Sequence, residues 1–93
     1  DYSNYDCIYV QFNDNGVNNS VYFMTENCNQ VNLFNLYRKG SDDGMWYHGA
    51  LLTFTGTSAV FSRQGSLNIS DTGSNVWDNT SGVYVTKIIG YKY

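Results

Sequence analysis

The chain has 93 residues, of which 42% are hydrophobic and 17% aromatic, whereas only 14% are charged. A chain of this length forms one small domain, and its richness in Asn, Ser, Thr, Gly and Tyr is typical of an all-β extracellular protein rather than of a cytosolic helical one. The formal net charge of −3, with only five Lys and Arg residues, argues against binding to nucleic acid or to an anionic membrane.

The first predicted element is a β-hairpin around Asn15-Gly16. A type I′ turn needs positive φ at both central residues, which Asn and Gly tolerate best. Pairing outward from this turn places Ile8 opposite Phe23 and Val10 opposite Val21, so that one face of the hairpin is β-branched and aromatic.

The two cysteines lie at the start and just beyond the end of this hairpin. The register sets Cys7 opposite Met24, and Cys28 follows four residues later. A disulfide therefore requires the chain to turn back at Glu26-Asn27, because the two Cα atoms must come within about 7 Å. We expect this turn and a Cys7–Cys28 disulfide, which would stabilise the fold by roughly 3 kcal/mol.

Apolar runs separated by turn clusters continue to the end of the chain. Residues 31–37 fit either a short helical face or a strand, and their length favours a strand. The last run has apolar residues on both faces, which predicts a central strand. The pattern predicts an all-β fold for residues 1–93, a small antiparallel β-sandwich of about six to seven strands. Further strands are expected at Met45–Thr55, Ala59–Arg63, Leu67–Ser70, Val76–Trp77 and Val83–Tyr93.

A weak internal repeat offers one alternative function. Asn32-Leu33 precedes Asp42-Asp43 by ten positions, and Asn68-Ile69 precedes Asp78-Asn79 by the same ten. Acidic and amide pairs in two such loops could supply oxygen ligands to Ca²⁺. In this respect the sequence resembles the βγ-crystallin domains, although both loops lack the Ser or Thr of that family's pattern. The simpler interpretation is that these residues form ordinary turns.

Catalytic chemistry has little support in the sequence. General acid–base catalysis needs two positioned titratable groups, and no spacing connects His48 with Glu26 or Arg63. His48 is interpreted as a strand residue between aromatic neighbours. No Gly-x-Ser-x-Gly elbow and no zinc-ligand spacing occur. We expect neither enzymatic activity nor a cofactor.

The aromatic residues allow two interpretations. Trp46, Tyr47 and Trp77 could be core and strand-face residues, or they could stack on sugar rings in a glycan-binding module. Tyrosine is also favoured at protein interfaces, because it is amphipathic and loses little rotamer entropy. The residues alone leave these interpretations open.

The start of the chain resembles a known family. Asp6-Cys7-Ile8, Phe12, Asp14, Val17-Asn18-Asn19 and Tyr22 are similar to the first hairpin of the Magnaporthe Avr and ToxB-like (MAX) effectors of plant-pathogenic fungi. This resemblance implies a small secreted β-sandwich with a disulfide cysteine on its first strand. Several MAX effectors bind host proteins, including heavy-metal-associated domains of plant immune receptors, partly by strand pairing at a sheet edge. The Tyr5-Asp6-Cys7 segment is also similar to the start of ribonuclease-like effectors of powdery mildews, so an effector of that type without activity is an alternative.

The sequence therefore predicts a secreted, non-enzymatic virulence effector that binds a host protein, with translocation into the host cell as an option. Asp1 is interpreted as a mature N-terminus left by signal cleavage. We expect edge-strand pairing as the binding mechanism. The predicted contact residues, all from the first hairpin, are Ile8, Val10, Phe12, Val21 and Phe23.

Overall fold

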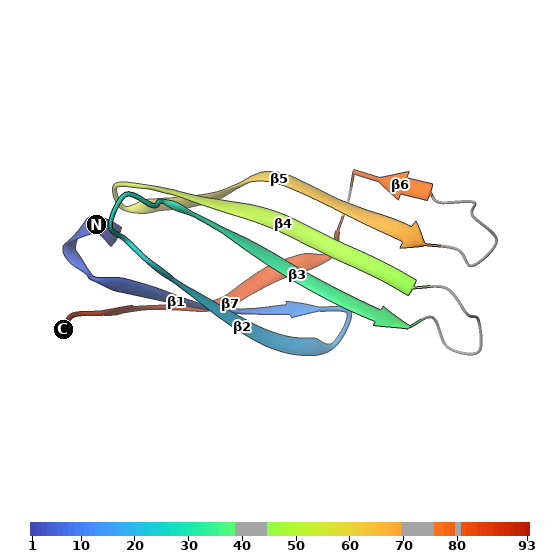
Figure 1. Ribbon diagram of the computed structural model, residues 1–93, viewed down its shortest axis with the longest axis horizontal. Helices are drawn as coiled ribbons and strands as arrows, with labels where there is room; N and C mark the ends of the chain where they lie inside the picture. The colour runs from blue at the N-terminus through green and yellow to red at the C-terminus, as the bar shows by residue number, and fades with distance from the viewer. Residues whose placement is uncertain (39–44, 70–75, 80) are drawn as a thin grey trace.

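The computed structural model describes residues 1–38, 45–69, 76–79 and 81–93, and within these the backbone alone of residues 37–38, 68–69 and 76–77. Two antiparallel sheets face each other (Figure 1). A short 3₁₀ turn, Tyr2–Asn4, precedes them. The first sheet has the order β2-β1-β7 and contains β1 (Cys7–Asp14), β2 (Val17–Met24) and β7 (Val83–Tyr91). The second has the order β3-β4-β5-β6 and contains β3 (Gln30–Arg38), β4 (Met45–Thr55), β5 (Ser58–Ile69) and β6 (Val76–Asp78). The predicted all-β sandwich is confirmed.

The first hairpin has the predicted register. Ile8 pairs with Phe23 and Val10 with Val21. Asn15 and Gly16 form the turn with φ values of 51° and 83°, as a type I′ turn requires. The ambiguous segment at residues 31–37 is a strand, because it lies within β3.

Two strand predictions are wrong. Ala59–Arg63 and Leu67–Ser70 were expected as separate strands, but β5 runs without a break through Gly65, which pairs directly with Gly49 of β4. The second error concerns Val83–Tyr93, which was expected to lie centrally. It forms β7, an edge strand that ends at Tyr91. Val83 reaches the core, whereas Tyr84, Ile88 and Tyr91 are exposed.

The core lies between the two sheets and contains the inward-facing side chains of β1, β3 and β4. Phe54 of β4 joins it to the N-terminal turn, since its ring lies 5.3 Å from that of Phe23 and 5.8 Å from that of Tyr2 between centroids. The cluster consists of Ile8, Val10, Phe12, Phe23, Val31, Leu33, Ala50, Leu52, Phe54 and Val83. Among the described residues, no helix is long and apolar enough to cross a membrane.

Two leucines on β3 provide a test of this core. Leu33 is fully buried between the sheets, whereas Leu36 is exposed on the outer side of the same strand. We expect Leu33→Ala to lower the free energy of unfolding by about 2 to 5 kcal/mol, because it leaves a cavity. Leu36→Ala should change it by less than about 0.5 kcal/mol. Urea unfolding followed by tryptophan fluorescence measures both, and equal losses would contradict the assignment of inner and outer faces.

Candidate functional site

The residues predicted to contact a partner lie in the core. Ile8, Val10, Phe12 and Phe23 are buried, and Val21 is half-buried and packs against the same cluster. β1 is paired on both sides, so Ile8, Val10 and Phe12 lie on a strand without a free edge, and their prediction as edge contacts is wrong. β2 is an edge strand, so backbone pairing at Val21 and Phe23 stays a prediction.

The predicted disulfide is absent, and both cysteines are free thiols. Cys7 is buried on the outer side of the first sheet, where it pairs with Met24 and Tyr91. The chain turns at Asn27 (φ 57°), as expected, but it then crosses to the second sheet. There the exposed Cys28 donates its thiol hydrogen to the carbonyl of Gln30 at 3.3 Å. The turn therefore separates the cysteines instead of joining them.

Alkylation distinguishes the two arrangements. We expect iodoacetamide to add one carbamidomethyl group to the native protein, at Cys28, because Cys7 is buried. In denaturant both cysteines should react. Intact-mass spectrometry and peptide mapping measure the products. A protein that gains no adduct in either buffer or denaturant would support the predicted disulfide.

The alternative calcium loops do not form a described site. Asp42 and Asp43 lie outside the described residues, whereas Asp78, the last residue of β6, and the following Asn79 are exposed. Within the described part of the chain, no group of three or more His, Cys, Asp or Glu residues could hold a metal ion.

The structure instead brings together a buried polar network that the sequence did not indicate. Asp14 ends β1 with its side chain only 1% exposed, and its carboxylate oxygens lie 2.8 and 2.9 Å from Nδ1 of His48 on β4. Asn35 of β3 donates its amide to the same carboxylate at 3.5 Å and accepts one from Asn19 of β2 at 2.8 Å. One network therefore links both sheets through four strands, and it provides the hydrogen bonds that a buried carboxylate requires.

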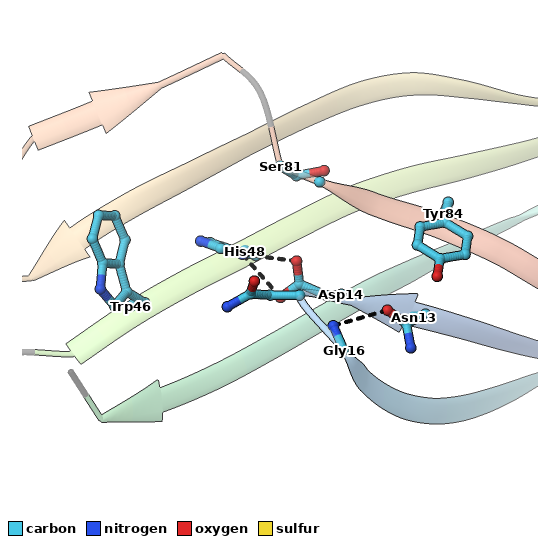
Figure 2. A pocket seen from close by; sticks show the side chains of 9 residues that line it. Asn13, Asp14, Gly16, Trp46, His48, Ser81 and Tyr84 are labelled. Atoms are coloured by element: carbon cyan, nitrogen blue, oxygen red, sulfur yellow. Dashed lines mark hydrogen bonds and ion pairs between the residues drawn. The ribbon is translucent and has the colours of Figure 1, made fainter. Parts of the chain in front are cut away.

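Asp14 and His48 of this network line a pocket of about 700 Å³ beside the Asn15-Gly16 turn (Figure 2). Trp46 stands near His48 with its ring edge-on at 5.8 Å, while Tyr84 of β7 lies on the opposite side of the carboxylate. The remaining lining residues are Asn13, Asn15, Gly16, Ser81 and Gly82.

The pocket combines His, Asp and Ser, but their contacts do not form a nucleophilic triad. Ser81 Oγ accepts the backbone N–H of Val83 at 3.2 Å and donates to Oε1 of Gln64 at 3.4 Å. Its hydroxyl hydrogen is thus directed away from His48, whereas an activated serine donates to the histidine. Neither Glu26 nor Arg63 lines this pocket. The described contacts give the Asp14–His48 pair a structural role, that of holding the two sheets together.

Removal of His48 tests this role. We expect His48→Ala to lower the free energy of unfolding by about 3 to 5 kcal/mol, because it leaves a buried carboxylate without its main partner. Adding Asp14→Asn should recover part of the loss, since no unpaired charge then remains. Chemical denaturation of the single and double variants measures this coupling. A loss below about 1 kcal/mol for His48→Ala would contradict a structural ion pair.

A second feature, the flank between β5 and β7, is open along most of its length. β7 has β1 on one side only, and β6 pairs with no more of β5 than Ser66–Asn68. Among the described residues, the outer edges of Ser58–Gly65 and of β7 therefore carry no ladder partner. The molecule extends 47 Å along its long axis but only 20 and 18 Å across, so this flank is a long surface.

Core-facing side chains are exposed at this flank. Directly paired residues of an antiparallel sheet share a face, so Ile88, the partner of Val10, and Phe61, the partner of Leu52, both face the core. Yet Ile88 is 44% exposed and Phe61 37%, whereas their partners are buried. A pocket of about 280 Å³ lined by Ile88 reaches inward to Ile8 and Phe54. The sandwich is therefore not closed on this side.

Comparisons with protein-family models, with curated proteins and with solved structures give no match for this chain.

The sequence indicated neither the flank nor the network. The apolar residues on both faces of Val83–Tyr93 predicted a central strand, and this prediction did not indicate the flank, because β7 lies at an edge. Asp14 and His48 are 34 residues apart, and no local pattern connects them. Of the aromatic residues, Trp46 lines the pocket and Tyr47 lies beside a separate depression, whereas the side chain of Trp77 lies outside those described.

Proposed function

We propose that this protein binds another protein, without catalysing a reaction, by accepting an extended segment of that protein along the open flank. The observation that supports this most directly is the exposure of Ile88, a core-facing residue on an edge strand. Long edges with exposed apolar residues are sites of strand addition or of aggregation, and proteins that do not use them usually cover them.

An added strand would both pair with the backbone of β7 and cover the apolar side chains that are exposed at this flank. Its backbone would pair with the free N–H and C=O groups of β7, which supplies affinity. Its side chains on alternate positions would point toward the core, where they would cover Ile88 and Phe61 and extend the layer formed by Val10 and Leu52. We expect apolar residues at these positions, because the pocket at Ile88 reaches inward to the apolar side chains of Ile8 and Phe54. Specificity would come from this match.

The proposed partner is a host protein and the domain a secreted effector, as the resemblance of the first hairpin to MAX effectors implies. Edge-strand pairing is the mechanism expected from that resemblance, but here the binding edge is β7 rather than the first hairpin.

A lysine on the core-facing side of β7 tests the proposal. A partner strand would have to bury the new charge in Ile88→Lys, whereas the unbound protein leaves this position exposed and should fold. Thr86→Lys is the matched control, since it adds the same charge at an exposed position of the same strand. The probe is a phage-displayed library of random linear peptides selected on the wild-type protein. Selected peptides should alternate apolar and polar residues, and Ile88→Lys should weaken their binding by about a hundredfold or more.

The results distinguish which kind of molecule binds at the flank. Selected peptides that bind wild type, Ile88→Lys and Thr86→Lys equally would exclude the flank as the binding site. A dimer seen by sedimentation and abolished only by Ile88→Lys would identify a second copy of the chain as the occupant. Loss of binding to a purified plant heavy-metal-associated domain in Ile88→Lys alone would support the host-protein proposal.

A further inference from the structure

The outer face of the second sheet carries two exposed aromatic rings that have no role in the core. Phe34 of β3 is 51% exposed, and Tyr47 of β4 is half-exposed. Their ring centroids lie 6.2 Å apart and their planes differ by only 26°. The pair therefore forms a nearly parallel aromatic surface on the side of the sheet that faces away from the first sheet.

Glycine at position 49 allows Tyr47 to lie over the sheet. A Cβ on Gly49 would stand 2.7 Å from Cζ of Tyr47, a distance that real Cβ atoms do not show. The phenol ring thus occupies the space above the Gly49 backbone. On the next strand the direct partner of Gly49 is Gly65, so that two neighbouring strands carry no side chain at this level. The backbone at Gly49 therefore supports one face of the Tyr47 ring.

A shallow depression of about 360 Å³ adjoins this ring. Gly49 and Gly65 contribute backbone to its lining, Tyr47 borders it, and Asn32 and Arg63 line it from the row that also contains Leu51. Asn32 and Arg63 are both exposed. The N–H groups of the guanidinium and of the amide can donate to hydroxyl or carboxylate oxygens, and the amide oxygen can accept from a hydroxyl.

We infer that this depression binds a sugar chain. The apolar face of a pyranose ring would stack on Tyr47, which borders the depression, and its hydroxyl or carboxylate oxygens would bond to Arg63 and Asn32. A lipid would require an enclosed aliphatic site, and a nucleic acid would require several cations. Arg63 is the one charged residue among the described side chains that line the depression. This site is separate from the flank at β7, so it stands or falls independently of the proposed protein partner.

The probes are cellohexaose, which is neutral, and hexagalacturonate, which carries carboxylates. Either one is titrated into ¹⁵N-labelled protein while amide shifts are followed by NMR. We expect shifts centred on Tyr47, Gly49 and Gly65. Tyr47→Ala should weaken binding by about tenfold or more, since it removes the stacking surface. Tyr47→Phe, which keeps the ring, should bind within about twofold of wild type.

Matched variants complete the test. Tyr22→Ala removes a tyrosine that is 65% exposed on the other sheet, and it should leave binding unchanged. Arg63→Gln should weaken the uronide more than the neutral sugar if the guanidinium pairs with a carboxylate, and both equally if it bonds hydroxyls. Failure of both sugars to bind, or equal binding by wild type and a folded Tyr47→Ala, would overturn the proposal. Ile88→Lys should not affect sugar binding, because it lies on the other sheet.

Discussion

In the described part of the chain, β1 is the member of the first sheet with a neighbour on each side, and its register determines most of what surrounds it. Side chains alternate along a strand, so Ile8, Val10 and Phe12 fall on the core face, and the next residue in that series is Asp14. The alternation that builds the core therefore also carries a carboxylate into it. A buried carboxylate is costly unless it is hydrogen-bonded, and His48 with Asn35 supplies those bonds from the opposite sheet. The hairpin, the core and the polar network thus follow from one register.

The two flanks of the sandwich differ because of where the chain crosses between sheets. On one side β2 continues directly toward β3, and the Asn19–Asn35 hydrogen bond ties the two edge strands together. On the other side the chain reaches β7 only after β6, which covers a three-residue part of β5. Nothing in the described chain spans the rest of that flank. The exposure of Phe61 and Ile88 is therefore a consequence of connectivity, and no local feature of either strand produces it.

The sequence predicts the features that depend on local chemistry. Asn15-Gly16 determines the hairpin register because the turn permits few others. Gly65 led to the wrong prediction of two separate strands, because glycine usually interrupts a strand. In the structure Gly65 pairs with Gly49, which lies beneath the ring of Tyr47. The Asp14–His48 pair could not be predicted, because it depends on how one sheet is placed on the other. The same holds for the contact residues, since an apolar hairpin face is compatible with either a core or an interface until a second sheet is seen to cover it.

Lysine on an edge strand often prevents that strand from pairing with another chain. β7 contains Lys87, and the direction of this side chain determines whether it has such an effect. Its partner in the ladder is Gln11, which alternates with the buried Val10 and Phe12 and so faces away from the core. A strand added to β7 would leave Lys87 in solvent on the outer face, and its charge would cost the complex little. The position that could block addition is the adjacent core-facing one, and it holds Ile88. The one charged residue of β7 therefore lies on the outer face, and the proposed partner strand would not have to bury it.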